Sequence, residues 1–381
     1  MKILIIGNRK HQLLYSLLKE IKKEYDDDSL LIDVFSQETS DDKYETDALY
    51  DSIFTLSMPK FISENRILRG IYKQYLFRRQ ISKLGHYDFV HIHYIEDILI
   101  RDAQYFVKKM KSKLIVSIWG SDFLRASDFK KKQMLPILKY ASKITIANSV
   151  AKESFLKYYS GSISNTKVIL CWFCIEPLDT LKRIIDKSTK KESKRLFGFT
   201  KKVVITIGYN ASAMQQHLEI LKSIEVNSDL HKFHNQVEFV IPLTYPKNAT
   251  YIQEIENFIK KSKFKFTLLT NFLSNEKVSQ LRIASDIMIQ LQTTDMLSAS
   301  MLEHIYAKNI IITGSWLPYK DLREWGLVYH EVEEVMDIGQ KLQNVLLNID
   351  DFISEIKINR SILNQKYNKN EIISQWINLY N

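Results

Sequence analysis

Short runs of Ile, Val and Leu recur along the chain, and most are followed by a longer segment in which apolar residues return every three or four positions. Uninterrupted apolar runs are typical of parallel strands that helices cover on both faces. In the first half this pattern predicts strands at residues 2–6, 30–35, 89–93, 114–118, 144–147 and 167–170. The alternation of such strands with helices predicts a doubly wound α/β domain.

The pattern pauses in a charged, helix-like segment at residues 176–202 and then resumes. Strands are predicted next at residues 203–207, 237–241, 264–269, 287–291 and 310–313. We therefore expect two Rossmann-like α/β domains with doubly wound parallel sheets, at residues 1–178 and 179–365, facing each other across a cleft. A helix within residues 366–381 is expected to cross back to the first domain. Ligands are expected at the carboxyl ends of the strands.

Composition and charge narrow the class of protein. Hydrophobic residues make up 45% and charged residues 26% of the 381 residues, as in folded proteins with sizeable cores. No run approaches the roughly 18 apolar residues of a membrane span. The apolar start at residues 3–6 is too short for a signal peptide, so we expect a cytoplasmic protein. The formal net charge of +10 favours anionic partners.

Two pairs of residues with metal-binding side chains lack the further ligands that a metal site needs. Cys171 and Cys174 form a single pair in mid-chain, and His231 and His234 are likewise alone. We expect structural roles for all four residues and no metal site.

A strand predicted to end at Gly208 is followed by a small polar loop and a helix, over residues 206–217. Backbone N–H groups and the positive end of a helix dipole in such a loop can hold a phosphate. Candidate nucleotide ligands here are Gly208, Asn210, Ser212 and His217. The alternative is an ordinary strand-to-helix turn, since neither the G-x-G-x-x-G nor the Walker pattern is present.

The segment from Asp295 to Glu303 predicts a second helix start that faces a ligand. Ser298 or Ser300 can cap a helix that begins just after them, which leaves backbone donors around Ala299 for a diphosphate. Glu303, one turn into this helix, can accept two hydrogen bonds from ribose hydroxyls. Alternatively, Glu303 only complements the helix N-terminus.

Asp295 and Glu303 are eight positions apart, and this spacing resembles the Glu-x7-Glu element of retaining GT-B glycosyltransferases of family 4, with Asp in place of the first Glu. The resemblance implies that Glu303 binds the nucleotide ribose. It also implies that Asp295 lies near the donor sugar and the diphosphate.

Residues 204–326 also resemble the nucleotide-binding half of the bacterial 4-acetamido-fucosyl transferases that build enterobacterial common antigen. The matching pieces lie at predicted strand ends, at residues 208–212 with 216–219, at 241–246 and at 270–273. The resemblance implies a GT-B fold. Base recognition is expected near Thr244, Tyr245, Asn271 and Phe272.

The first half resembles the same transferases more loosely. Residues 87–94 are similar to their Asp-x-x-His-x-His strand end, and residues 117–122 to their His-Gly-Ser-Asp acceptor-side loop. Strand alternation puts His91 and His93 on the same face, and only His93 reaches the strand end. For both residues the alternative is a core histidine. The acceptor-side residues implied are Asn8, Trp119 in place of the usual His, Gly120, Ser121 and Asp122.

Family 4 enzymes usually place an Arg and a Lys after the first strand of the second domain, where they neutralise the departing diphosphate. Residues 208–217 contain neither, so the charge must come from elsewhere. The candidates are Arg9, His217, Lys320 and Arg323, together with the backbone N–H groups of residues 298–300. Lys320 and Arg323 are alternatively solvated surface charges.

Residues 61–84 contain six basic residues and one acid, Glu64. Helical spacing separates an apolar side from a basic side, as in helices that lie on an anionic lipid surface. The apolar side comprises Leu68, Ile71, Tyr72, Tyr75 and Leu76, and the basic side Arg66, Arg69 and Lys73. The segment predicts peripheral contact with an anionic membrane; the alternative is a core-facing helix with a solvated basic face.

Together these features predict a hexosyl- or N-acetylhexosaminyl-type glycosyltransferase. It is expected to use a nucleotide-sugar donor and a saccharide or lipid-linked saccharide acceptor in bacterial surface polysaccharide synthesis. Helix dipoles can hold the diphosphate, so no metal or other cofactor is expected. The family 4 spacing implies retention of configuration, and this is the outcome we expect.

The resemblance to the antigen transferases implies inversion instead, with His93 or Asp122 as the base. The alternatives to a transferase are a catalytically silent GT-B-like partner subunit and a sugar-nucleotide epimerase on the same fold. Nucleic-acid binding is not expected, because the sequence contains no recognised motif for it.

Overall fold

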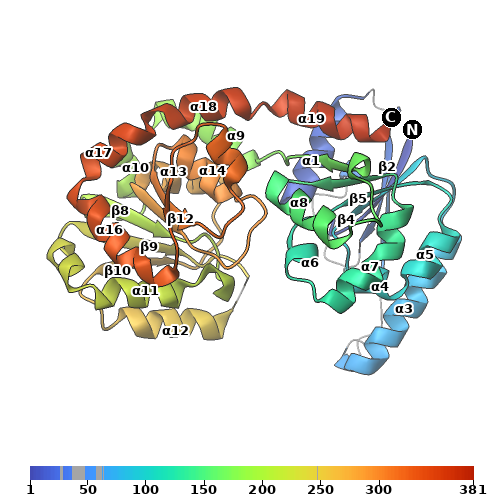
Figure 1. Cartoon of the computed structure of the whole chain (residues 1–381), viewed down its shortest axis with the longest axis horizontal. Helices are drawn as coiled ribbons and strands as arrows, with labels where there is room; N and C mark the ends of the chain where they lie inside the picture. Colours follow the sequence, from blue (N-terminus) through green and yellow to red (C-terminus); the bar gives the residue numbers. More distant parts are fainter. Residues whose placement is uncertain (26–28, 37–47, 57–61, 63, 247) are drawn as a thin grey trace. The chain divides into compact units, whose positions relative to one another are not determined.

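The computed structural model describes residues 1–25, 29–36, 48–56, 62, 64–246 and 248–381, without the side chain of Arg66. Of the basic segment 61–84, positions 61 and 63 thus lie outside the described residues. The chain forms two compact units, each a parallel sheet with helices around it (Figure 1). Unit 1 comprises Met1–Cys174 and Lys369–Asn381, and unit 2 comprises Ile175–Asn368.

Unit 1 contains a seven-stranded parallel sheet in the order β3-β2-β1-β4-β5-β6-β7. Its strands are β1 (Lys2–Ile6), β2 (Leu31–Ser36), β3 (Ser52–Thr55), β4 (Phe89–His93), β5 (Lys113–Ser117), β6 (Lys143–Ile146) and β7 (Val168–Leu170). Ile3 of β1 pairs with Ile32 on one side and with Phe89 on the other. The direction of winding therefore reverses between β1 and β4.

Helices surround the sheet of unit 1 (Figure 1). They are α1 (Gln12–Lys23), α3 (Arg66–Lys83), α4 (Asp97–Arg101), α5 (Ala103–Lys109), α6 (Ser121–Leu124), α7 (Asp128–Tyr140), α8 (Ser149–Tyr158) and α19 (Lys369–Ile377). In α1, for example, Leu14, Leu17 and Ile21 are spaced three or four positions apart and are buried. Trp376 of α19 is fully buried, and its Nε1 donates to the carbonyl of Trp172 at 2.6 Å.

Unit 2 contains a six-stranded parallel sheet in the order β10-β9-β8-β11-β12-β13. Its strands are β8 (Val203–Ile207), β9 (Val237–Pro242), β10 (Lys265–Leu269), β11 (Ile287–Gln290), β12 (Ile310–Gly314) and β13 (His330–Val332). Side chains alternate between two cores, so that Ile205 and Ile207 join one and Val204 the other. Winding reverses here between β8 and β11.

The helices of unit 2 begin with the charged segment at residues 176–202, which forms two helices as its pattern predicts. These helices and the others are α9 (Glu176–Ile184), α10 (Lys190–Leu196), α11 (His217–Val226), α12 (Ala249–Ile259), α13 (Asn275–Ala284), α14 (Ala299–Tyr306), α15 (Lys320–Glu324), α16 (Ile338–Leu347), α17 (Ile349–Glu355) and α18 (Asn359–Lys366). Among the described residues, no helix is both long and apolar enough to cross a membrane.

The doubly wound α/β architecture and every strand predicted from the sequence are confirmed, with strand ends within one residue of those expected. The strands β3 and β13 were not predicted. Both lie at a sheet edge, where one side of the strand has no neighbour, and their sequences Ser-Ile-Phe-Thr and His-Glu-Val are short and partly polar. Such edge strands lack the continuous apolar run that reveals an interior strand.

Candidate functional site

The carboxyl ends of β8 and β11 form the ligand-binding edge that the topology predicts for unit 2. Loops that follow neighbouring strands on either side of a winding reversal diverge and leave room for a ligand. Gly208 follows β8, and its N–H donates to the carbonyl of Ile289 in β11 at 2.9 Å. This hydrogen bond ties the first loop of the site to the neighbouring strand.

A side chain at Gly208 would collide with its surroundings. A Cβ there would lie 2.7 Å from His217 Nε2 and 2.9 Å from Gln215 Oε1. The φ angle of +62° at this position also suits glycine far better than other residues. Gln216, with φ of +57°, turns the chain so that α11 begins at His217. The loop therefore brings two polar side chains into the space that Gly208 leaves.

His217 presents an uncharged ring nitrogen in this space. Its backbone N–H donates to the Tyr251 hydroxyl, which also lies 3.2 Å from Nδ1. If that hydroxyl donates to Nδ1, the ring proton is on Nε2. Burial lowers the pKa of His217 to about 4, so the ring is uncharged at neutral pH. Nε2 has no hydrogen-bond partner in the described part of the chain.

Gln292 supplies the third polar group beside Gly208. Its Oε1 accepts hydrogen bonds from the Tyr209 hydroxyl at 3.1 Å and from Gln215 Nε2 at 2.7 Å. Over the residues that the structure describes, Gln292 Nε2 and Gln215 Oε1 are buried without a partner. Buried polar atoms are nearly always paired, so these atoms are candidates to contact a polar ligand.

The start of α14 has the predicted cap. Ser298 Oγ accepts the backbone N–H of Met301 at 3.1 Å, and the helix begins at Ala299. Of the two capping residues that the sequence allows, Ser298 is therefore the one used. Ser300 Oγ is buried and has no partner among the described residues.

A chain of hydrogen bonds fixes Asp295 in the loop that leads to α14. The Tyr319 hydroxyl donates to Asp295 Oδ2 at 2.5 Å and accepts from Gln290 Nε2 at 2.7 Å. Gln290 Oε1 in turn accepts from Ser298 Oγ at 3.0 Å. Burial, together with Asp295, raises the pKa of Tyr319 well above its usual value, so its hydroxyl stays protonated and can donate.

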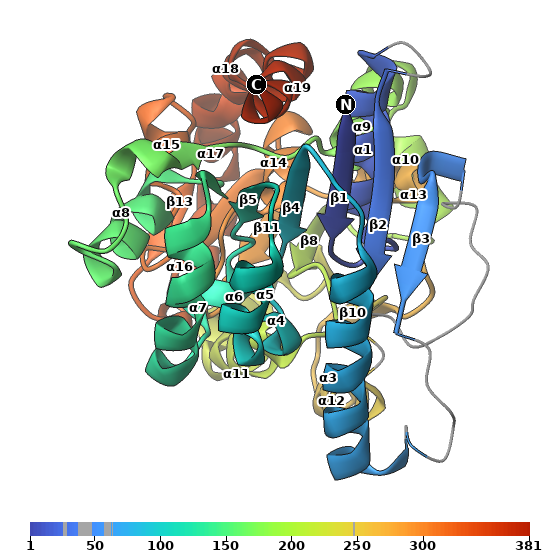
Figure 2. The same ribbon diagram turned by 90° about the vertical axis from the view of Figure 1, so that its right-hand side faces the viewer.

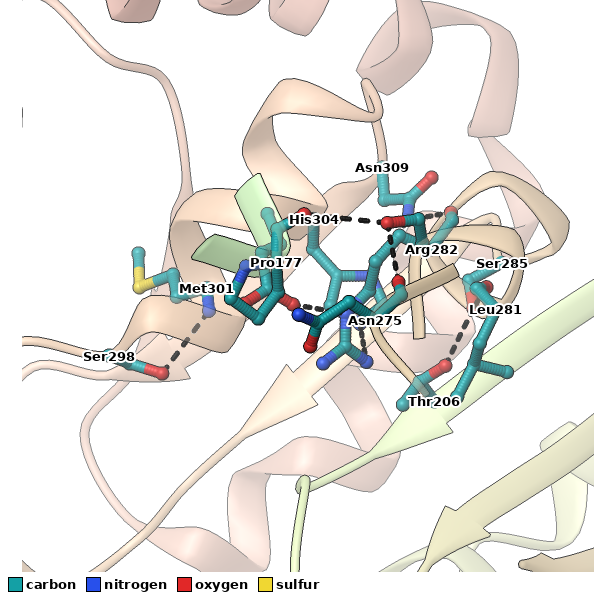
Figure 3. A network of polar contacts seen from close by, with 12 residues as sticks. Pro177, Thr206, Asn275, Leu281, Arg282, Ser285, Ser298, Met301, His304 and Asn309 are labelled. Carbon is teal, nitrogen blue, oxygen red and sulfur yellow. Dashed lines mark hydrogen bonds and ion pairs between the residues drawn. The ribbon is translucent and has the colours of Figure 1, made fainter. Parts of the chain in front are cut away.

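Glu303 lies in the interior of unit 2, where it pairs with Arg282 of α13. Arg282 Nε donates to Glu303 Oε2 at 2.8 Å. Arg282 Nη1 lies 3.0 Å from His304 Nε2, and Figure 3 labels these two residues. Burial raises the pKa of Glu303, and the guanidinium opposes this shift. Glu303 is therefore not a surface acid that only complements the helix N-terminus.

The loops after β8 and β9 meet beside this ion pair. The Tyr245 carbonyl accepts the N–H of Ala211 at 2.6 Å, and the Asn210 side chain accepts the N–H of Ser212 at 2.9 Å. Desolvation raises the pKa of the Tyr245 hydroxyl, and the charge of Glu303 adds to the rise. The phenol is thus within electrostatic range of Glu303.

The other residues predicted to contact the base lie in two loops, one after β9 and one after β10. Thr244, next to Tyr245, is half-buried, whereas Asn271 and Phe272 follow β10 and are exposed. Phe272 is 78% exposed, which leaves its ring available for stacking. Because β10 is two strands from β8, these two residues lie at the edge of the sheet.

The basic side chains predicted to neutralise the diphosphate are divided between the two units. Lys320 lies 3.4 Å from Glu324, and its side chain is 62% exposed. Arg323 pairs with Glu331 at 2.9 Å and covers the Tyr329 ring. Both form surface ion pairs, which the sequence left as the alternative, and Arg9 is buried in unit 1.

Gly7 and His93 mark the corresponding winding reversal in unit 1. A Cβ on Gly7 would lie 3.0 Å from the carbonyl oxygen of His93. Both ring nitrogens of His93 are buried and have no partner among the described residues. Burial lowers the pKa of His93 to about 3, and the ring lies near Trp119 and Trp376.

His91 is the core histidine that strand alternation suggests. Its Nδ1 lies 2.7 Å from the Tyr380 hydroxyl and its Nε2 lies 2.8 Å from Ser117 Oγ. Both nitrogens are thus satisfied, in contrast to those of His93.

Asp122 ties together the loops after β4 and β5. Its carboxylate accepts the backbone N–H groups of Ile95 at 3.2 Å and of Trp119 and Gly120 at 3.0 Å. Burial raises the pKa of Asp122 to about 6, although these hydrogen bonds oppose the shift. The structure thereby brings Trp119, Gly120 and Asp122 together, with Ser121 half-buried between them and Asn8 exposed after β1.

A family model described as 4-alpha-L-fucosyltransferase, glycosyl transferase group 56, matches residues 49–287, more than half of the chain. The chain belongs to this family. It is therefore a glycosyltransferase, as the sequence predicts. A comparison with curated proteins finds no match.

Several solved structures share the fold of this chain. Anabaena HepE, in complex with UDP and glucose, is 13% identical, with a TM-score of 0.70 over 100% of this chain and 99% of that one. A glycosyltransferase from Rickettsia africae is 15% identical, with a TM-score of 0.70 over 100% and 97%. Sucrose-phosphate synthase from Thermosynechococcus elongatus is 12% identical, with a TM-score of 0.71 over 100% and 98%. The predicted GT-B fold is thus confirmed.

Sequence reasoning missed several residues that shape the site of this group 56 glycosyltransferase. Arg282, Gln290, Gln292 and Tyr319 each bond to predicted residues or to the loops that carry them. Gln290 and Gln292 could have been found as polar residues at the end of an apolar strand. Arg282 gives no such signal, because a charged residue in a helix is most often on the surface.

Proposed function

We propose that the chain transfers a sugar from a nucleoside-diphosphate sugar, bound by unit 2, to a saccharide or lipid-linked saccharide acceptor. The family is described by a sugar-transfer activity. HepE structures contain UDP with glucose or UDP-glucose, which supports a nucleotide-sugar as the donor. We further propose that the product belongs to a bacterial surface polysaccharide and that the reaction occurs at the cytoplasmic side of the membrane.

The observation that carries this proposal is the group of buried, unpartnered atoms beside Gly208. His217 Nε2 and Gln292 Nε2 offer donors, and Gln215 Oε1 offers an acceptor. This mixture suits the phosphate oxygens and hydroxyls of a nucleotide-sugar. Each unsatisfied buried group costs about 1–3 kcal/mol, which a polar ligand in this position would recover.

Glu303 is proposed as the ribose ligand. Arg282 engages Oε2 and so orients the carboxylate, whereas Oε1 makes no hydrogen bond to the described residues. The Arg282 guanidinium also opposes the rise in pKa that burial imposes on this carboxyl. A charged carboxylate accepts hydrogen bonds more strongly than a neutral acid.

The diphosphate is proposed to lie at the start of α14. The unpartnered hydroxyl of Ser300 and the first N–H groups of the helix, around Ala299, point to an acceptor-rich ligand. His217 Nε2–H adds a neutral donor. Helix dipole and neutral donors together take the role of the missing Arg and Lys, so we propose that no metal is required.

The stereochemical outcome is proposed from the family. Membership of group 56 agrees with the resemblance that implies inversion, and inversion needs a base for the acceptor hydroxyl. His93 has unpartnered nitrogens, whereas both oxygens of Asp122 accept backbone N–H groups. We therefore propose His93 over Asp122 as the base. Retention, implied by Asp295 and Glu303, is the alternative; NMR of the anomeric proton of the product distinguishes the two.

A thermal-shift panel tests the proposal. The full chain is heated with each nucleoside diphosphate and its sugar conjugates in excess EDTA, and again with Mg²⁺. We expect a rise in melting temperature that is selective for one base and needs no metal; a ligand at 100 times its Kd stabilises by about 2.7 kcal/mol. No shift under either condition would overturn the donor site. A shift only with Mg²⁺ would overturn the metal independence alone.

A further inference from the structure

Helix α3 of unit 1 has two apolar stripes that follow each other along the helix, one over residues 77–81 that is buried and one over residues 67–75 that is not. Phe77 and Ile81 are buried and attach the helix to the sheet. The second stripe is exposed to solvent and comprises Ile67 (75% exposed), Leu68 (49%), Ile71 (63%) and Tyr75 (56%). We call these four residues the outer stripe.

The outer stripe lies on a strongly basic helix. Residues 66–83 contain six basic side chains and no acidic one, although the chain as a whole has 44 acidic residues. Arg79 and Lys83 are exposed, and Lys73 is half-buried. Large exposed apolar side chains within a basic helix are typical of segments that lie at an anionic lipid surface.

The helix is held firmly in unit 1. Arg78 forms an ion pair with the buried Asp102 at the start of α5, and Gln74 Nε2 donates to the same carboxylate at 2.8 Å. These contacts are made from the middle and the C-terminal half of α3. Most of the outer stripe lies nearer the N-terminus, so it is presented by a helix that is already anchored beyond it.

The outer stripe lies toward the carboxyl ends of the strands in the unit 1 sheet. Figure 2 shows α3 extending past the arrowheads of β1 and β2, the end at which the strands reach their carboxyl ends. His93 is the last residue of β4 and Trp119 comes shortly after β5, so both lie at that same end of the parallel sheet. Because the outer stripe occupies the first turns of α3, it lies on the part of the helix that projects farthest.

We propose that the outer stripe and the basic residues around it dock unit 1 on the surface of an anionic lipid bilayer. The inference rests on the proposed lipid-linked acceptor, whose saccharide would be presented at such a surface. A second copy of the chain is the less suitable occupant, because pairing two outer stripes would bring together two helices that carry only positive charges.

The test is sedimentation of the full chain with vesicles. One set consists of equal parts phosphatidylglycerol and phosphatidylcholine, and the other of phosphatidylcholine alone. We expect binding to the anionic vesicles only, and weaker binding as salt rises. Ile67→Glu/Ile71→Glu and, separately, Lys73→Gln/Arg79→Gln should each weaken binding about tenfold or more.

Val226→Glu is the matched control, because Val226 is 73% exposed at the end of α11 in unit 2. It should bind vesicles like the unchanged chain. Melting temperature and nucleoside-diphosphate binding are measured for every variant and should not change. These readings show that a loss of vesicle binding comes neither from unfolding nor from loss of the donor site.

Three results would overturn the docking proposal. They are the absence of binding to anionic vesicles, equal binding by Ile67→Glu/Ile71→Glu, and a dimer in solution that this double variant abolishes. If the chain does not bind vesicles but still binds the nucleotide donor, only the docking proposal is overturned. If the chain binds vesicles but no nucleotide, the proposed donor site is overturned and the docking proposal stands.

Discussion

His217 Nε2 lies 2.7 Å from the position that a Cβ on Gly208 would occupy. The glycine at the end of β8 and the first residue of α11 therefore share one small space, and only a residue without a side chain allows this. The consequence is a buried, uncharged imidazole nitrogen at the winding reversal of the unit 2 sheet, where ligands bind in doubly wound folds.

Gly208→Ala should destabilise unit 2 and impair nucleotide binding. The added methyl group would meet His217 and Gln215 and would also strain the backbone, so we expect a cost of about 2–4 kcal/mol and at least tenfold weaker binding. Gly198→Ala is the control, because Gly198 has φ of +69° and nothing within 4 Å of an added Cβ. It should show only the backbone strain, about 1 kcal/mol. Denaturant unfolding measures the stability of each variant, and calorimetry measures its affinity for nucleotide. Equal effects of Gly208→Ala and Gly198→Ala would contradict the space shared by Gly208 and His217.

Acid should weaken unit 2 through His217. Its pKa is about 4 in the folded state and about 6.5 when unfolded, so the unfolded chain binds the extra proton between these values. Stability therefore falls as pH drops through this window. His217→Gln should reduce the slope by about 1 kcal/mol per pH unit near pH 5. Denaturant unfolding at several pH values measures this. His86→Gln, which changes an exposed histidine, is the control, and parallel curves for His217→Gln and the unchanged chain would rule out a buried neutral ring.

Glu303→Gln should weaken nucleotide binding by more than the ~1 kcal/mol of an ordinary hydrogen bond. It keeps the shape of the side chain but removes the charge that faces Arg282, so a stability cost of about 3 kcal/mol is expected as well. The added change Arg282→Met should recover part of that stability, because it removes the unpaired buried charge. It should not recover the affinity for nucleotide. Unchanged affinity in folded Glu303→Gln would remove this residue from the ribose site.

Asp122→Asn should act on the loops of unit 1. An amide cannot accept hydrogen bonds on both ends, so at least one of the three backbone N–H groups loses its partner, at about 1–3 kcal/mol. We expect a lower melting temperature, slower transfer, and unchanged donor binding. Full stability combined with abolished transfer would instead identify Asp122 as the base.

Much of the fold is predictable because parallel strands covered on both faces are continuously apolar. The site is predictable only where a residue type is unusual for its position, such as the glycine at the end of β8 or the acid at Glu303. The Arg282–Glu303 pair joins residues 21 positions apart, and the Gln290–Tyr319 hydrogen bond joins residues 29 apart. Long-range pairs of this kind leave no periodic pattern in the sequence.

The central claim is that a nucleoside diphosphate binds at the carboxyl ends of β8 and β11 without a metal. Hydrogen exchange of the full chain in EDTA, with and without the nucleoside diphosphate that gives the largest thermal shift, tests it most directly. The account predicts slower exchange in peptides that span residues 206–217 and 291–303. Slower exchange confined to unit 1, or unchanged exchange with bound nucleotide, would contradict it.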